Sequence, residues 1–322
     1  MRHLWFVPFG LLAVSVCAFG SIDSGLLGLV PSSAQIVGGF DVTTSRNSEF
    51  GRYLVAKSQA EDPHLQQLMT ETGFDPRRDL QSVLFASGNP NLDSPGHSFA
   101  VLARGTFDEQ RILAHAQAQG SHSLTYQGVQ MMVNSSPNGH GGGRQTAFAF
   151  LDTGVAALAD VATLRQIILN RATPSVLDPT LQSKIDDVGR KNDIWYAAIT
   201  NNDFLAQHFT AGNGNAKVLQ SVAQSSGGAK LGSTIDITFH AITRSAQDAT
   251  ALADVIHFLA SMVQMQRQND RRADLMASSL DTMTVRTVGT AVDFAMSMPE
   301  KNLEQIADLS PKGKPRIKPH MQ

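Results

Sequence analysis

Residues 234–242 read TIDITFHAI, and polar and apolar side chains alternate along this stretch. Such alternation is typical of an antiparallel strand that buries one face and leaves the other in water. The following segment, Ala246 to Gln268, has apolar residues at helical spacing and predicts a long amphipathic helix. Its apolar stripe consists of Leu252, Val255, Ile256, Leu259 and Val263. Together the two segments predict an α+β fold, in which helices pack on an antiparallel sheet.

The same two patterns predict the other strands and helices, working outward from this stretch. Strands are predicted at 34–41, 82–87, 98–103, 122–126, 129–133, 145–151, 155–159, 193–200, 282–288 and 291–296. Helices are predicted at 25–30, 45–57, 64–72, 108–119, 161–170, 203–208, 216–224 and 300–309, and turns at 74–80 and 127–128. Gly38 and Gly39 fall inside the first strand, where glycine marks a bend or a close neighbour. Gly73 and Gly120 follow two helices, where glycine commonly ends a helix.

Two pairs of similar segments lie 139 residues apart and indicate an internal duplication. Thr106 to Glu109 and Ser245 to Asp248 each follow a strand, open a helix and fit a capping box. Leu164-x-Gln-Ile recurs as Leu303-x-Gln-Ile. We therefore expect two copies of one unit, each an antiparallel sheet with helices packed on one face. The expected boundaries are a first repeat at 21–172, a linker at 173–191, a second repeat at 192–309 and a disordered basic tail at 310–322.

The first twenty residues, MRHLWFVPFGLLAVSVCAFG, have the features of an export signal. Arg2 gives a positive start, residues 4–16 are largely apolar, and Ala18 and Gly20 are small residues before Ser21. We expect cleavage before Ser21 and a location in the periplasm or outside the cell. Retention of residues 4–20 as a membrane anchor is an alternative, although this length is at the low end for a spanning helix.

Cys17 is the only cysteine and lies inside the predicted leader. The mature protein would therefore have no disulfide, no thiolate metal ligand and no cysteine nucleophile. Lipid attachment at Cys17 is another alternative. The preceding Val14-Ser15-Val16 departs from the usual lipoprotein pattern, because a bulky valine stands directly before the cysteine.

Composition restricts the functional classes that remain. A hydrophobic content of 42% with 17% charged residues is typical of a folded soluble chain, rather than of a disordered or polytopic membrane protein. The net charge is −2, and loss of the leader would remove one basic residue, Arg2, and make the charge one unit more negative. We expect no nucleic-acid partner, because nothing in this balance would attract phosphates. Membrane contact is expected only through an uncleaved N-terminal segment or the basic tail.

Asp152-Thr153-Gly154 is the one motif with a nameable catalytic residue. Aspartic proteases carry Asp-Thr-Gly after a strand, but their chemistry needs two carboxylates that share a proton. The matching hairpin of the second repeat reads Thr287 to Thr290 and has no aspartate. We therefore expect Asp152 to be an exposed turn residue, with a homodimeric protease as the alternative.

Other motifs do not assemble a site. His140-Gly141-Gly142-Gly143 resembles an oxyanion loop, but the chain contains no Gly-x-Ser-x-Gly nucleophile, and a loop tip is expected. The histidines show no metal-ligand spacing. His97, His115 and His122 are scattered, whereas His240 and His257 are expected to be hydrogen-bonded core residues. We expect no catalytic residue, no cofactor and no metal, and no nucleotide-binding glycine loop is present.

Several stretches carry a family resemblance: LLGLVPSSAQIVGGFDV (26–42), SRNSEFGRYLV (45–55), FDPRRDLQSVLFAS (74–87) and AVLARGTFD (100–108). They resemble an uncharacterised family of exported bacterial proteins, seen in Acidobacteria and related phyla. The resemblance covers roughly residues 26–170. It implies export and a shared fold, and no known activity comes with it.

These observations favour a non-enzymatic, exported protein of the cell envelope, a binding or structural scaffold with an unknown protein or envelope partner. A hydrolase of aspartic-protease type, using Asp152, is one alternative. An extracytoplasmic subunit of a membrane complex, held by the uncleaved first segment, is another.

Overall fold

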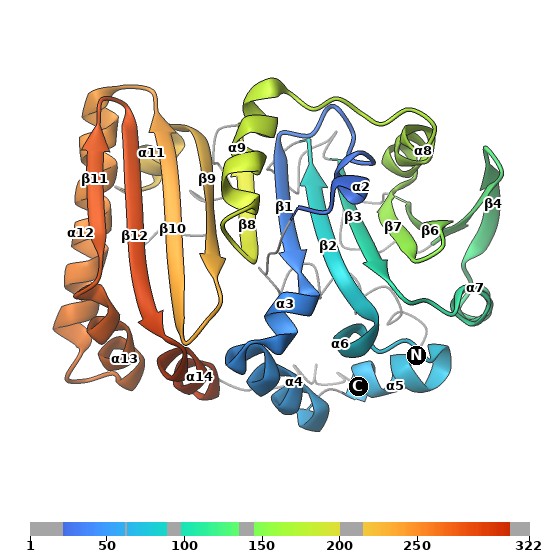
Figure 1. Cartoon of the computed structure of the whole chain (residues 1–322), viewed down its shortest axis with the longest axis horizontal. Helices are drawn as coiled ribbons and strands as arrows, with labels where there is room; N and C mark the ends of the chain where they lie inside the picture. The colour runs from blue at the N-terminus through green and yellow to red at the C-terminus, as the bar shows by residue number, and fades with distance from the viewer. Residues whose placement is uncertain (1–21, 62, 89–97, 135–144, 200–214, 310–322) are drawn as a thin grey trace, which may run out of the picture.

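The structure is a computed structural model that describes residues 22–61, 63–88, 98–134, 145–199 and 215–309. Within these ranges, twelve antiparallel strands form one sheet, and helices lie against it (Figure 1). The strands are β1 (Ile36–Asp41), β2 (Leu80–Ser87), β3 (Phe99–Gly105), β4 (His122–Tyr126), β5 (Val129–Val133), β6 (Thr146–Asp152), β7 (Val155–Asp160), β8 (Ile194–Ala198), β9 (Val222–Lys230), β10 (Thr234–Thr243), β11 (Thr284–Val288) and β12 (Ala291–Pro299). The helices are α2 (Ser24–Leu27), α3 (Val42–Asn47), α4 (Glu49–Glu61), α5 (Pro63–Thr72), α6 (Pro76–Asp79), α7 (Glu109–Ala118), α8 (Val161–Asn170), α9 (Pro179–Gly189), α11 (Asn215–Gln220), α12 (Ala246–Gln266), α13 (Arg271–Leu280) and α14 (Glu300–Asp308). The predicted α+β class and antiparallel sheet are confirmed.

Strands of the two predicted repeats are neighbours in this sheet. The order across it is β11-β12-β10-β9-β8-β1-β2-β3-β7-β6-β5-β4. β1 pairs with β8, so the strand that opens the first half lies beside the strand that opens the second. In the first half, β1, β2 and β3 precede α7, and the later β6–β7 hairpin places β7 beside β3. In the second half, β8, β9 and β10 precede α12, and the β11–β12 hairpin places β12 beside β10. An internal duplication would produce this shared order, and superposition of the two copies remains a prediction.

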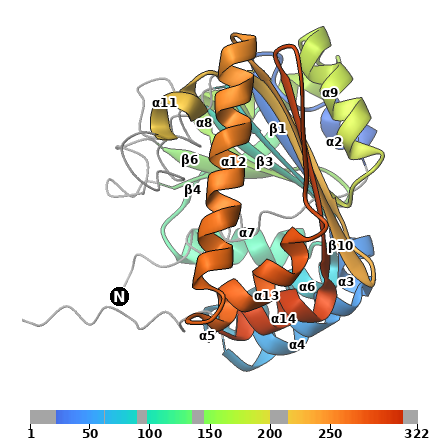
Figure 2. The same cartoon turned by 90° about the vertical axis from the view of Figure 1, so that its left-hand side faces the viewer.

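Helices cover both faces of the sheet, rather than one face as predicted from the sequence. The apolar side chains of α2, α8 and α9 join Trp195 in the largest core cluster. Successive strand residues point to opposite faces, so Tyr196 faces away from this cluster. Tyr196 pairs with Gly227, which pairs with Phe239, and this register places the cluster under α11 and α12 on the opposite face (Figure 2). α5 and α7 pack on that second face in the first half.

The central strands approach each other through glycines. A Cβ added to Gly39 of β1 would lie 2.3 Å from Cζ2 of Trp195 on β8. A Cβ on Gly228 of β9 would lie 2.2 Å from the carbonyl oxygen of Ile194. The close neighbour predicted for Gly39 is therefore confirmed, and it is the indole of Trp195, which is fully buried.

Two predicted helix starts have different outcomes. α12 begins at the predicted cap, where Ser245 Oγ accepts from the backbone N–H of Asp248 at 3.1 Å and donates to its carboxylate at 2.6 Å. α7 is capped by Asp108, whose carboxylate accepts from the N–H of Arg111 at 3.1 Å, so Thr106 is not the cap. A carboxylate two residues downstream takes the role assigned to the hydroxyl, because both are effective N-cap acceptors.

The second half contains elements that the sequence patterns missed. The helix predicted at 216–224 ends at Gln220, and residues 222–230 form β9. α13 was not predicted, and the helix predicted at 203–208 lies outside the described residues. The predicted linker contains α9, and this helix buries Leu181, Ile185 and Val188 in the largest core cluster. This part of the segment 173–191 therefore belongs to the folded core.

The Asp75–Asp79 part of the FDPRRDL stretch forms the short helix α6 rather than a simple turn. Asp75 caps the helix and pairs with Arg77, whose Nε and Nη2 lie 2.8 and 2.9 Å from its two oxygens. Asp79 pairs with Arg78 at 2.6 and 2.7 Å. Arg46 of α3 donates to the carbonyls of Arg77 and Arg78 at 2.7 and 2.8 Å. Each charge in this motif is satisfied locally, which indicates a structural role.

Candidate functional site

Asp152 lies where a turn residue would be expected. It ends β6, is exposed, and its Oδ1 accepts from the N–H of Thr153 at 2.8 Å. Gly154 follows with φ of 75°, the left-handed conformation that glycine adopts readily. The expectation of an exposed aspartate that caps its own hairpin is confirmed. The pKa of Arg104 on β3 is raised mainly by its pairing with Asp23, and the charge of Asp152 adds to this effect.

The described histidines do not come together. His115 of α7 lies 3.2 Å from the carboxylate of Glu71 on α5, and burial lowers its pKa while Glu71 opposes that effect. His240 of β10 lies 2.6 Å from Asp293 of β12, on a half-exposed part of the sheet. His122 and His257 are exposed, so the core position predicted for His257 is wrong. Its position on α12 faces away from the sheet, which the apolar neighbours in sequence did not reveal.

Other predicted features give no assembled centre. Within the described residues, no group of three or more His, Cys, Asp or Glu side chains could hold a metal ion. His97 and the loop at His140 to Gly143 lie outside those residues, as do the leader with Cys17 and the basic tail. In the same part of the chain, no helix is both long and apolar enough to cross a membrane.

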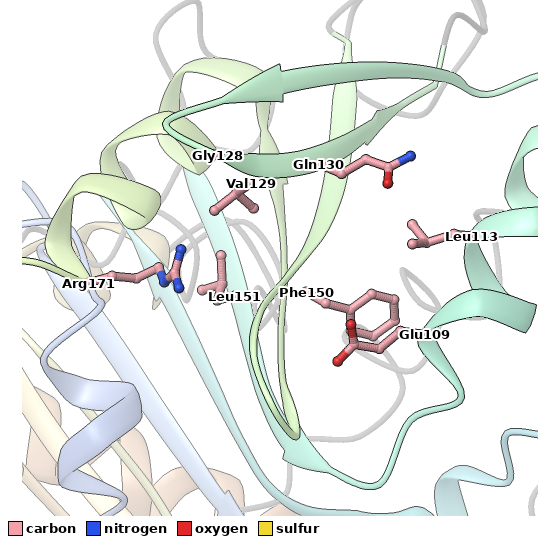
Figure 3. Close-up of a pocket in the computed structure, with 8 residues that line it drawn as sticks. All are labelled: Glu109, Leu113, Gly128, Val129, Gln130, Phe150, Leu151 and Arg171. Atoms are coloured by element: carbon pink, nitrogen blue, oxygen red, sulfur yellow. The ribbon is translucent and has the colours of Figure 1, made fainter.

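A small cavity opens where β5 and β6 separate. The ladder between them covers Met131 to Val133 against Ala147 to Ala149. Beyond it the strands diverge around a cavity of about 220 Å³ (Figure 3). Its lining residues are Glu109, Leu113, Gly128, Val129, Gln130, Phe150, Leu151 and Arg171.

This cavity passes between the two strands from one face of the sheet to the other. Val129 and Leu151 belong to the core cluster under α8, whereas Glu109 and Leu113 come from α7 on the opposite side. Figure 3 shows Arg171 at one end and Glu109 beside Phe150 at the other. A carboxylate and a guanidinium at opposite ends, with no nucleophile among the lining residues, do not form a catalytic set. The volume is also below the roughly 300–1,000 Å³ of common ligand pockets.

The most distinctive surface feature is an apolar stripe along the outer side of α12. Phe258 is 53% exposed, Leu259 is 37% exposed and Met265 is 72% exposed. Half-buried Val255 and Met262 lie on the same side, at helical spacing from them. Ala249, Leu252 and Ala253 are buried and fix the opposite side of the helix on the sheet. Figure 2 shows α12 standing in front of the sheet along its full length.

Sequence reasoning identified α12 but assigned its apolar residues to a single buried stripe. Leu252 and Ile256 do join the core cluster, whereas Leu259 is exposed and Phe258 lies outside the predicted stripe. The apolar residues cover more of the helix surface than the sheet can bury. The large number of apolar residues in this helix, rather than their spacing, was the sequence feature that could have indicated an exposed apolar surface.

The comparisons with known proteins inform the fold. No protein-family model matches this chain, and no curated protein matches it in sequence. The solved structure described as "Structure of crystal form IV of TP0453" is similar, with a TM-score of 0.50 and 12% sequence identity. The likeness covers 87% of this chain and 95% of that chain. It supports the α+β arrangement over nearly the whole length of both chains.

Proposed function

We propose that this chain is an exported, non-enzymatic protein of the cell envelope that binds another protein through the apolar stripe of α12. The observation that carries the proposal is the exposure of Phe258, Leu259 and Met265 within one helix. Contiguous exposed apolar side chains of this kind mark interaction surfaces, because leaving them in water costs free energy.

The size of the stripe favours a partner that contributes a short apolar segment. The three most exposed side chains present roughly 300 Å² of apolar surface, judged from the full areas of such residues. A stable dimer commonly needs about 800 Å² from each partner, so this stripe alone is small for a second copy of the chain. An amphipathic helix of another envelope protein fits better, since it can place its own apolar residues between those of α12.

Export is the second part of the proposal, and it rests on the leader-like first twenty residues and on the resemblance to exported bacterial proteins. N-terminal sequencing of the protein from its native envelope tests it. The expected first residue is Ser21. A lipid-modified Cys17 or a retained Met1 would replace cleavage by one of the alternatives above, and would place the protein on the membrane surface.

Site-specific photocrosslinking tests the docking surface. A benzoylphenylalanine at position 258 should crosslink in intact cells to a different envelope protein, identified by mass spectrometry. The same group at Ser183, an exposed position of α9 on the opposite face of the sheet, is the matched control. The adduct should disappear when Met265→Asp is added to the chain that carries the probe.

Four outcomes would contradict this function. Equal crosslinking at positions 258 and 183 would show that the stripe is no preferred surface. An adduct of twice the chain mass would indicate self-association, and a lipid adduct would indicate membrane contact. Pepstatin-sensitive peptide cleavage that Asp152→Asn abolishes would instead place the protein among the hydrolases.

A further inference from the structure

Helix α14 is attached to α4 by contacts between residues about 250 positions apart. Glu300, the first residue of α14, accepts through Oε1 from the backbone N–H of Phe50 in the first turn of α4. The single proton of the Tyr53 hydroxyl is directed at two acceptors of α14, the carbonyl of Glu304 at 3.2 Å and the carboxylate of Asp308. Glu300 therefore supplies an acceptor to the N-terminus of α4 from the other end of the described chain.

The second carboxyl oxygen of Glu300 has an unfavourable environment. Glu300 is 2% exposed, and its Oε2 has no hydrogen-bond partner among the described residues. The neighbouring carboxyl of Glu49 could bond to it only if one of the two carried a proton, because ionised carboxylates only accept. Burial raises the pKa of Glu300, and the negative charges of Glu49 and Glu304 raise it further.

Few charges face Glu300 from the elements packed around it. Within the described part of the chain, Glu49 and Arg52 of α4 and Glu304 of α14 act on it, and Arg52 alone favours the ionised form. The turn before β10 contributes a backbone carbonyl, that of Ser233, which accepts from the N–H of Glu300 at 3.3 Å. α13 contacts α14 near both ends: Asn302 donates to the carbonyl of Leu275 at 3.2 Å, and Arg271 donates to Gln305 at 3.1 Å.

We propose that α14 and α4 form a proton-dependent clasp, in which buried Glu300 is protonated when the clasp is closed and, once ionised, is repelled by the neighbouring carboxylates. A carboxyl whose folded-state pKa is raised binds its proton more tightly in the closed form. Its contribution to closure is therefore largest below the ordinary value of 4.5 and is lost as pH rises through the raised value. Because α13 still holds α14, loss of the proton loosens the α4 contact while the sheet remains folded.

Amide hydrogen exchange of the full chain at pH 5 and pH 8 tests the clasp. After correction for the intrinsic pH dependence of exchange, protection of Phe50 and of the first turn of α14 should fall severalfold at pH 8. Glu300→Gln should keep its protection at both pH values. Its side-chain carbonyl can accept from Phe50, and its amide can donate to Glu49 as the protonated acid does.

Controls separate the clasp from a general effect of charge. Glu109→Gln, at the first position of α7 and away from this cluster, should respond to pH as the wild type does. If Glu300→Gln fails to fold by circular dichroism, Glu49→Gln tests the same pair from the other helix. A pH-independent wild type would overturn the proposal, and so would an equal loss of protection in wild type and variant.

Discussion

The indole of Trp195 on β8 lies directly against the backbone of Gly39 on β1, in the register pair that joins the two halves of the sheet. Any other residue at position 39 would place its Cβ 2.3 Å from Cζ2 of the indole. Trp195 is completely buried in the largest core cluster, together with apolar residues of α9. The close packing between the two halves therefore requires that residue 39 has no side chain.

Gly39→Ala should destabilise the protein by about 1–3 kcal/mol, the usual cost of forcing extra atoms into a packed core. Urea unfolding, followed by tryptophan fluorescence, measures this. Gly28→Ala is the control, because its Cβ would meet Pro174 at an ordinary 3.4 Å. Equal stability of Gly39→Ala and wild type would show that the sheet junction can open to admit the methyl group.

The turn between β4 and β5 contains a strained residue. Gln127 has φ of 49° and Gly128 has φ of 76°, the left-handed conformations of a two-residue hairpin turn. Gln127→Asn should stabilise the hairpin by up to about 1 kcal/mol, because asparagine tolerates this conformation better than glutamine. Amide exchange at Tyr126 and Val129 reports the change locally. Gln127→Val should have the opposite effect, and the same sign for both variants would contradict the explanation.

Asp23 and Arg104 form an ion pair between the segment before α2 and strand β3. Burial raises the pKa of Asp23, but hydrogen bonds from Arg104, the Leu26 amide and Ser82 outweigh this and leave the pKa below 3.8. A lowered carboxyl pKa stabilises the fold above the unfolded value and loses that contribution as pH falls through the folded value.

Asp23→Asn should therefore destabilise the protein at pH 7 by about 1–2 kcal/mol, since the pair is only partly shielded from water. The difference from wild type should shrink as pH falls below about 4. Thermal unfolding at several pH values measures both effects. Asp152→Asn should change stability by less than about 0.5 kcal/mol at each pH, as expected for an exposed turn residue.

His115 should make the α5–α7 contact sensitive to mild acid. Its side chain is 11% exposed, and burial lowers its pKa while the charge of Glu71 opposes that shift. The unfolded chain therefore binds a proton more readily, and stability should fall as pH decreases from about 6.5. His115→Gln should reduce this loss in thermal unfolding between pH 7 and pH 5. His257→Gln, at an exposed position, serves as the control.

Local patterns predicted most of the first half well. β4, β5 and α8 have the predicted bounds, because alternation, helical spacing and the glycines at positions 120 and 128 all act within a few residues. The turn at Asp152 could be predicted for the same reason. A side chain that bonds to the next amide needs no distant partner.

Features that depend on distant residues could not be predicted. β9 reads VAQSSGGAK, which has little strand propensity, and it is extended because β8 and β10 pair with it on both sides. Gly227 and Gly228 are needed there, because neighbouring strand atoms fill the space of a Cβ. The apolar stripe of α12 could not be predicted either. The sequence shows that Phe258 is apolar, but not that it is left exposed after the helix packs on the sheet.

The sequence by itself determined the α+β class and most element positions. Burial on one side leaves a period of two in a strand and of 3.6 in a helix. Only the tertiary structure decided that the twelve described strands share one sheet, that helices cover both faces, and that Glu300 meets α4. These outcomes depend on the pairing of segments far apart in the chain, and the free energy of such contacts belongs to the pair rather than to either segment.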